Sequence, residues 1–156
     1  MPDRPIAGFE CALYYNSAAL NAAAVWAEIK NAKDVSLPDA ADEIDVSARY
    51  SKAKKYIAGM NDGSIEFGYQ YIRGTDAVFN ELEDRYLNRE PIEVAAADGD
   101  ITVEGTVYSR DWYTITKFER TEELGGSRVY NVTLRPTVVF NAGEMVERTF
   151  VTVEAP

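Results

Sequence analysis

The sequence predicts a mainly β protein with one α-helix, built either as two packed antiparallel sheets or as a partly closed β-barrel, with the helix on its flank. Two observations support this fold class. Apolar and polar residues alternate in short segments along most of the chain, which is typical of half-buried strands. Only one long segment, residues 75–89, shows a helical period behind a capping residue. The 156 residues contain no internal repeat and no linker rich in serine or glycine, so we expect a single domain, 1–156.

The central stretch, residues 42–72, shows the alternation most clearly. We expect a strand over 42–50, a long polar loop over 51–63 that ends in the turn-forming Asn61-Asp62-Gly63, and a returning strand over 64–72. The apolar positions of the two strands are Ile44, Val46, Ala48, Tyr50, Ile65, Phe67, Tyr69 and Tyr71. Alternation this regular predicts that one face of the two strands packs on a core and that the other faces water or a partner.

The helix is predicted to begin at Thr75 or Asp76, either of which is a suitable N-cap. Its apolar stripe, expected to pack in the core, consists of Phe79, Leu82 and Tyr86. Asp76, Glu81, Glu83 and Asp84 give the helix an acidic outer face.

The other segments are predicted to be short strands and turns. Residues 1–10, with two prolines, are expected to form an irregular N-terminal arm, and the alanine-rich segment 16–24 is a short helix or a loop. Strands are expected over 11–15, 25–29, 34–37, 91–97, 101–108, 110–120 and 127–136, followed by a terminal hairpin within 137–156. Asp98-Gly99-Asp100 is a hairpin turn signal, and Gly105 suggests a bulge or bend. Large side chains on both alternate faces of 110–120 predict a strand covered on two sides.

Composition argues against an enzyme. The chain has no histidine, which removes the commonest general base, the usual zinc ligand and every Ser-His or Cys-His pair. Its single cysteine, Cys11, excludes an internal disulfide, and we expect it to be a small buried residue of an apolar strand. Asp98 with Asp100, and Glu122 with Glu123, are interpreted as turn residues rather than as catalytic or calcium-binding pairs. We therefore expect no catalytic residue, no cofactor and no metal.

Charge and hydropathy indicate which partners to expect. Acidic residues outnumber basic ones 26 to 16, giving a net charge of −10, so tight binding of nucleic acid is not expected. The first twelve residues include Asp3, Arg4 and Glu10, which does not fit a signal peptide, and no segment has the length of a membrane helix. We expect a soluble protein that is made in the cytoplasm and has no membrane partner.

The order and spacing of these segments resemble the major tail protein family of phages, the tube subunits of long non-contractile tails. The resemblance spans roughly residues 25 to 137. It lies in a Trp26-containing strand leading into AEIKNAKDVSL, in the acidic strand EIDVSARYSK, in NDGSIEFGYQYIRGTDAVFNELEDRYLNREPIEV, and in YTITKFERTEE and VYNVTLRPT. None of these segments is a strict motif, so the resemblance depends on their sequential arrangement. Residues 16–24 and the segment after Pro136 do not contribute to it.

This resemblance implies a structural role. Tubes of this family are stacks of six-subunit rings in which the inner sheets join into one continuous barrel, the helix lies outside and a long loop reaches the adjacent ring. Such a tube conducts DNA from capsid to host without binding it tightly, and its partners are further copies of the subunit, a tape-measure protein and a tail terminator. The implied location is the virion tail, assembled in the bacterial host cytoplasm. Tubes of contractile tails and of type VI secretion systems share this fold.

Two groups of residues are candidates for such a role. Glu43, Asp45, Glu66 and Gln70, on the polar faces of the central strands, are candidates for a tube wall that repels phosphate; the simpler interpretation is the solvated face of any antiparallel sheet. Lys52, Lys54, Lys55, Tyr56 and Met60, in the long loop, are candidates for contacts between stacked rings. For these the simpler interpretation is a solvated hairpin tip whose lysines block unwanted edge pairing.

Two other functions compatible with this fold class stay open. One is a β-sandwich binding module, for instance for a carbohydrate, which would display Trp26, Trp112 and Tyr113 together on its surface. The other is a different tube-fold component, such as a tail terminator, a baseplate hub piece or the tube of a secretion system.

Overall fold

The structure, a computed structural model, describes residues 11–18, 22–49, 52–71, 76–122, 124–126 and 128–155. These ranges hold twelve β-strands and one α-helix, which confirms the predicted mainly β class. The strands are β1 (Ala12–Asn16), β2 (Trp26–Glu28), β3 (Ala32–Ser36), β4 (Asp39–Asp45), β5 (Tyr56–Gly63), β6 (Ile65–Gln70), β7 (Ile92–Ala97), β8 (Val107–Glu122), β9 (Arg128–Pro136), β10 (Phe140–Asn141), β11 (Glu144–Met145) and β12 (Thr149–Thr152). The helix, α1, runs from Ala77 to Leu87.

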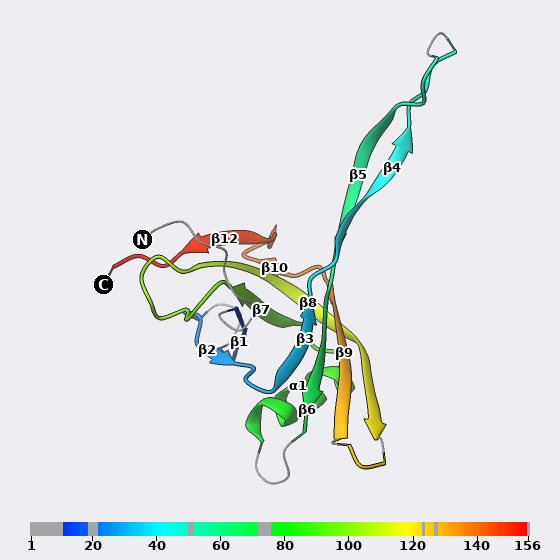
Figure 1. Ribbon diagram of the computed structural model, residues 1–156. Helices are drawn as coiled ribbons and strands as arrows, with labels where there is room; N and C mark the ends of the chain where they lie inside the picture. Colours follow the sequence, from blue (N-terminus) through cyan, green and yellow to red (C-terminus); the bar gives the residue numbers. More distant parts are fainter. Residues whose placement is uncertain are drawn as a thin grey trace, which may run out of the picture.

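The strands form one sheet of eight and two hairpins, all antiparallel and not closed into a barrel (Figure 1). The large sheet has the order β2-β1-β7-β8-β9-β6-β3, with β12 added beside β8. The 16-residue β8 is shared by two halves of this sheet, because its first part pairs with β7 and β12 and its later part with β9. A register shift between Ile115 and Lys117 interrupts the β8–β9 ladder, as a bulge does where a strand bends.

The core lies between the two halves of the sheet and α1. Leu82, Ile92 and Leu134 are completely buried there, although they come from the helix and from both halves. The alternation predicted for 64–72 is confirmed, since Ile65, Phe67, Tyr69 and partly buried Tyr71 pack in this core. The two-sided burial predicted for 110–120 is confirmed only in its first half, where the neighbours Trp112 and Tyr113 face opposite sides of β8 and both are buried. In the second half it is wrong, because Thr116, Lys117, Glu119 and Arg120 are exposed.

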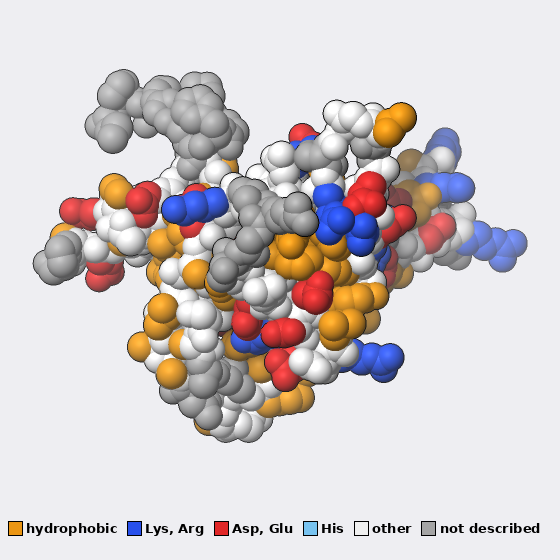
Figure 2. All heavy atoms as spheres, turned by 90° about the horizontal axis from the view of Figure 1, so that it is seen from below, with side chains coloured by type: hydrophobic (Ala, Val, Ile, Leu, Met, Phe, Trp, Pro, Cys, Tyr) orange, Lys and Arg blue, Asp and Glu red, His pale blue; other side chains and the backbone are white. Residues whose placement is uncertain are grey.

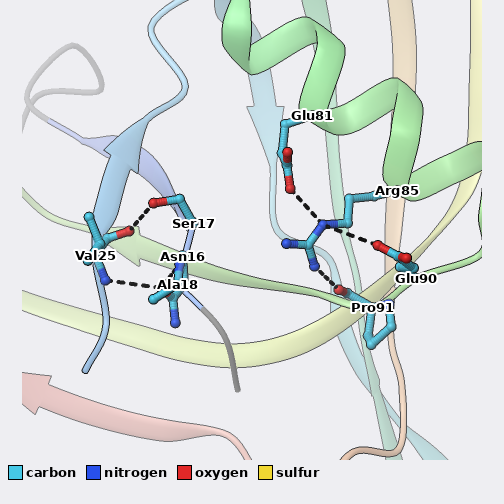
Figure 3. Close-up of polar contacts among 8 residues, drawn as sticks. All are labelled: Asn16, Ser17, Ala18, Val25, Glu81, Arg85, Glu90 and Pro91. Atoms are coloured by element: carbon cyan, nitrogen blue, oxygen red, sulfur yellow. Dashed lines mark hydrogen bonds and ion pairs between the residues drawn. The ribbon is translucent and has the colours of Figure 1, made fainter. Parts of the chain in front are cut away.

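Contacts at both ends hold α1 against the sheet. Asp76 is its N-cap and accepts a hydrogen bond from the Phe79 backbone N–H at 3.1 Å, and its carboxylate also accepts one from the Tyr69 hydroxyl at 2.7 Å. At the other end Arg85 bonds to Glu81 at 2.7 Å and to the Pro91 carbonyl at 2.5 Å (Figure 3). The predicted core residues Phe79 and Leu82 are buried, whereas Tyr86 is 37% exposed and stacks on Phe118.

The alanine-rich segment is not helical where the structure describes it, at residues 16–18 and 22–24. Instead, Asn16 closes the connection between β1 and β2. Its side-chain oxygen accepts hydrogen bonds from the backbone N–H groups of Ala18 and Val25, at 2.9 and 3.0 Å (Figure 3). Ser17 donates to the Val25 carbonyl from its backbone N–H and from its hydroxyl, so the ends of the segment meet as in a hairpin.

The strand predicted over 101–108 begins only at Val107, so most of that prediction is wrong. Asp100 accepts hydrogen bonds from the backbone N–H and the hydroxyl of Thr102, and the Thr106 hydroxyl donates to the Asp100 carbonyl. Gly105 has a φ of 87°, which glycine adopts without strain. The segment therefore folds as a set of turns, although its residues favour a strand.

Two smaller expectations need correction. Cys11 is exposed rather than buried, because it precedes β1 instead of lying within it. The terminal hairpin is shorter than predicted: β10 and β11 pair with each other, whereas β12 leaves them and pairs with β8. The predicted N-terminal arm, residues 1–10, lies outside the described residues.

Candidate functional site

A two-stranded arm projects from the body of the protein (Figure 1). We call residues 39–63 the β-arm; it consists of β4, β5 and the connection between them, described except for residues 50 and 51. The Ser64 N–H donates to the Pro38 carbonyl at 2.9 Å, so the β4–β5 ladder continues from the β3–β6 ladder of the main sheet. The β-arm is thus the outermost hairpin of the sheet, extended beyond the core.

This arrangement corrects two predictions about the central stretch. The loop expected over 51–63 is a strand from Tyr56 to Gly63, because β5 pairs with β4 along most of its length. The apolar face expected over 42–50 does not pack on the core, and every described β4 side chain is exposed. Ile44 lies beside Ile57 across the ladder, and both stay exposed because no other element of the described chain covers them.

The candidate stacking residues all lie on the β-arm. Lys52, Lys54 and Lys55 are exposed in the connection, whereas Tyr56 and Met60 belong to β5. Met60 is 84% exposed, the largest exposed fraction among the large apolar side chains in the described part of the arm. The arm tip, which we define as residues 46–55, therefore carries cations, and the strands below it carry uncovered apolar groups.

The connection begins in an ordered turn. The Asp45 carboxylate accepts a hydrogen bond from the Ser47 N–H at 2.8 Å, and the Ser47 hydroxyl oxygen accepts one from the Lys55 N–H at 2.9 Å. Hydrogen bonds from the Ser47 side chain and backbone lower the pKa of Asp45. The Val46 N–H donates to the Lys55 carbonyl, which extends the ladder one step beyond β4.

Two ion pairs hold the base of the β-arm to the body. Arg148, just before β12, lies 3.0 Å from the Asp39 carboxylate at the start of β4. Arg135, on β9, lies 3.1 Å from the Asp62 carboxylate near the end of β5. Each strand of the arm is therefore held by one ion pair at its base, β4 to the segment before β12 and β5 to β9. Sequence reasoning missed all four residues, since no local pattern relates positions so far apart.

The candidate wall residues do not share one surface. Glu66 and Gln70 lie on the face of β6 that points away from α1, whereas Glu43 and Asp45 lie on the β-arm.

The face that carries Glu66, here called the polar face, is made of β3, β6, β9 and the later part of β8. It contains a groove of about 650 Å³ lined by Lys33, Ser36, Glu66, Lys117, Asn131 and Thr133, among others.

The polar face is not uniformly acidic. Glu66 shares it with Lys33 and Lys117, and Lys117 pairs with Glu119 at 3.1 Å. Seen from below, the molecule shows Asp and Glu side chains interspersed with Lys and Arg side chains (Figure 2). A wall that repels phosphate through unpaired carboxylates is therefore not evident on a single copy.

The aromatic residues weighed for carbohydrate binding are not displayed together. Trp112 and Tyr113 are buried on opposite faces of β8. Trp26 is half-buried, packs edge-to-face on Tyr108 with ring centroids 5.9 Å apart, and is covered by Arg110. The burial of Trp112 and Tyr113 argues against a shared aromatic platform for a sugar.

Buried charge in the described residues is confined to a compact cluster. Glu93 is 4% exposed and pairs with Arg110 at 2.6 Å, and Asn16 donates to it at 3.4 Å. This pairing satisfies a carboxylate that would otherwise be costly to bury. Across the described ranges, no three Cys, Asp or Glu side chains are close enough together to hold a metal ion. Nor does any helix there reach the length and apolar character that a membrane crossing needs.

The sequence matches no protein-family model and no curated protein. The fold, in contrast, is similar to several solved structures. The SPP1 tail tube matches with a TM-score of 0.73 and 15% identity, over 97% of this chain and 81% of that one. The tail of an empty gene transfer agent (GTA) particle, refined with C6 symmetry, matches with a TM-score of 0.71 and 14% identity, over 94% of this chain and 98% of that one.

Contractile systems match less closely. The sheath–tube complex of an extracellular contractile injection system matches with a TM-score of 0.60 and 11% identity, over 97% of this chain and 95% of that one. At these identities the likeness shows the fold, which is the tail-tube fold, including the single helix and the open antiparallel sheets.

Proposed function

We propose that this chain is a structural, non-catalytic subunit of a tail tube, of phage or prophage origin. It assembles into rings, with six subunits as the expected number, and the rings stack into a hollow tube in the tail of the particle. The observation that carries the proposal is a fold match over 97% of the chain to the SPP1 tail tube. The C6 symmetry of the GTA tail supports the expected ring size.

In this role the β-arm supplies the contact between rings. An isolated two-stranded hairpin is marginally stable in water, and this one exposes the apolar Ile44, Ile57 and Met60. A second copy that covers these groups would stabilise both the arm and the stack. Glu43 and Asp45, which lie on the arm, belong to this contact rather than to the tube wall.

The wall of the bore is the polar face, with Glu66 and Gln70 pointing into the channel. This orientation places α1, which packs on the opposite face of the sheet, on the outside of the tube. Further copies close the ring by joining sheet edges, and β2 and β3 end the order of the large sheet. DNA passes through without tight binding, and a tape-measure protein and a tail terminator are the expected partners.

A second candidate is the tube of a contractile injection system. The comparison with such a tube covers nearly the whole of both chains, although its TM-score of 0.60 is lower than that of the two tail tubes. The two candidates predict different outer surfaces, because a contractile tube binds a sheath. A pull-down with sheath protein from the same particle separates them.

Negative-stain electron microscopy of the concentrated protein tests the proposal. Rings or tubes with a central hole are the expected result. A protein that stays monomeric at millimolar concentration and in the presence of the other tail components would contradict it. Comparison of tube and monomer by hydrogen exchange then identifies the covered surfaces, and we expect β5 to gain protection.

A further inference from the structure

The described cations of the arm tip form no ion pair with other described residues of the chain. Within the described part of the chain, no ion pair neutralises Arg49, Lys52, Lys54 or Lys55. The strand β5 has eight residues, which at about 3.3 Å per residue places the tip roughly 26 Å beyond the base of the arm. The cations of the arm tip therefore lie beyond the reach of the body from which the arm projects, whereas Met60, three residues before the end of β5, lies nearer the base.

A surface of the opposite character lies on the C-terminal segment. We call residues 138–154 the C-terminal surface; it carries Glu144, Glu147 and Glu154, and its single cation, Arg148, is already paired with Asp39. The loop 98–106 is attached to it, since the Gly105 N–H donates to the Val153 carbonyl and the Val153 N–H to the Thr106 carbonyl. That loop adds the exposed carboxylates of Asp100 and Glu104.

The C-terminal surface also exposes large apolar side chains. Phe140 and Met145 are cross-strand partners in the β10–β11 hairpin, and both are exposed. Phe150, on β12, is 73% exposed. Exposed aromatic and methionine side chains that lie together are typical of a protein interaction surface.

Other acidic regions fit the arm tip less well. On α1, Glu81 pairs with Arg85, which also lies 3.9 Å from Glu90, so these carboxylates are partly neutralised within the chain. At the end of β8, Glu122 is shared by Arg120 and Arg128. The polar face mixes lysines with carboxylates. The C-terminal surface combines carboxylates free of ion pairs, within the described residues, with uncovered apolar groups.

We propose that the C-terminal surface is the receptor for the β-arm of a second copy of this chain. The cations of the arm tip face Glu144, Glu147 and the adjoining acidic loop. The exposed apolar side chains of the arm strands, Ile44, Ile57 and Met60, cover Phe140, Met145 and Phe150. Each copy offers one arm and one receptor, so the contact is head-to-tail and propagates along a stack. This inference rests on the proposed function and specifies which surface receives the arm.

Disulfide crosslinking tests the contact directly. Both chains carry Cys11→Ser, so that the introduced cysteines are the only ones. An unlabelled chain with Met60→Cys is mixed with an isotopically labelled chain with Phe140→Cys. The mixture is allowed to assemble and is then oxidised, and mass spectrometry identifies the crosslinked dimers. A second pair combines Ile57→Cys with Phe150→Cys. The matched control replaces Phe140→Cys by Leu87→Cys, because Leu87, at the end of α1, is 66% exposed against 60% for Phe140. We expect crosslinked dimers of one labelled and one unlabelled chain from both pairs, Met60→Cys with Phe140→Cys and Ile57→Cys with Phe150→Cys. We expect no such dimers when Leu87→Cys replaces Phe140→Cys.

Charge reversal supplies a second readout. The triple variant Lys52→Glu, Lys54→Glu, Lys55→Glu should lose assembly while keeping the circular dichroism spectrum of the monomer. Adding Glu144→Lys, Glu147→Lys and Glu154→Lys in the same chain should restore it, whereas adding Glu81→Lys, Glu83→Lys and Asp84→Lys on α1 should not. Because both rescue sets change the charge equally, general repulsion does not explain a difference between them.

The outcomes separate this inference from the proposed function. Rings or tubes that form without either receptor crosslink, or a rescue by the α1 set in place of the C-terminal set, would overturn the inference and leave the tube role intact. The absence of any assembled form under all conditions would overturn both. Crosslinks at both receptor pairs together with rescue by the C-terminal set would establish the contact.

Discussion

The Arg148 guanidinium lies 3.0 Å from the Asp39 carboxylate, although 109 positions separate the two residues in the chain. This pair joins the last part of the chain to the first residue of β4, at the point where the β-arm leaves the body. Gly63 lies opposite Asp39 in the ladder, and a Cβ placed there would come within 3.2 Å of Arg148 Nη1. The absence of a side chain at position 63 therefore leaves room for the guanidinium to reach Asp39.

We expect Asp39→Asn to loosen the base of the β-arm without unfolding the body. Exposed ion pairs contribute about 0 to 1 kcal/mol, so the midpoint of urea unfolding should change little. Hydrogen exchange of residues 56–63 in the monomer should become faster, because the ladder loses one of the two ion pairs at its base. Glu119→Gln, which removes the exposed pair with Lys117, is the control and should leave exchange in 56–63 unchanged.

Leu82→Ala should destabilise the protein by about 2 to 5 kcal/mol, because the deleted atoms leave a cavity between α1 and the sheet. Leu82 is 0% exposed, whereas Leu87 on the same helix is exposed, so Leu87→Ala serves as the control and should have little effect. Urea unfolding followed by circular dichroism measures both. Equal losses from the two variants would contradict the position assigned to the helix.

Stability should fall at alkaline pH, in part through Tyr113. Burial, followed by the nearby charge of Asp111, raises the pKa of Tyr113 from 10.0 to about 12. The unfolded chain therefore loses this proton at lower pH than the folded chain, and the free energy of unfolding declines above pH 10. Well below pH 10 the contribution is constant, and by pH 12 the loss reaches about 2 kcal/mol.

The Tyr113→Phe variant, compared with the parent in urea at pH 8 and pH 11, tests this dependence. The decline between the two pH values should be smaller in the variant, which has no ionisable group at this position. Tyr56→Phe, at an exposed position of the β-arm, is the control. A variant that declines as steeply as the parent would show that Tyr113 is not responsible. Burial also raises the pKa of Tyr69, so part of the decline should persist.

If the polar face lines the bore, Glu66→Lys with Gln70→Lys should convert a passive wall into one that retains DNA. Added cations bind phosphate, and the retention should weaken as salt rises. Assembled tubes are incubated with short double-stranded DNA and then with nuclease, and protected DNA is measured. Glu83→Lys with Asn80→Lys on α1 makes the same change in charge and should leave the DNA open to digestion. Equal protection in both variants would reject this placement of the bore.

The alternation of apolar residues predicted strands correctly but did not predict what covers them. Ile44 and Phe67 occupy equivalent positions in two alternating segments, yet Phe67 is buried in the core and Ile44 is exposed on the β-arm. Periodicity reports the local backbone geometry, whereas burial depends on whether another element lies opposite. For Phe67 that element is α1 with the other half of the sheet, and for Ile44 the described chain supplies none.

Turn chemistry explains the other discrepancies. Residues 101–106 favour a strand by composition, but the side-chain hydrogen bonds of Asp100 and the positive φ of Gly105 fold them into turns. Asn61-Asp62-Gly63 has the composition of a turn but lies within β5, because its pairing with β4 holds the backbone extended. Of the candidate site, the cationic arm tip followed from the sequence. The ion pairs at the arm base and the uncovered Phe140, Met145 and Phe150 required the folded chain.

The joint between the β-arm and the main sheet has a mechanical consequence. Proline has no N–H group, so at Pro38 the ladder is held by the bond from Ser64 to the Pro38 carbonyl. The ladders on the two sides of this joint also carry register shifts, one between Lys33 and Ser36 and one between Ala41 and Glu43. If the chain forms the proposed stack, we expect each such joint to bend by a small angle without disrupting the two ladders that it connects. Added over many layers, these small angles would let a long filament curve under load without breaking its axial contacts.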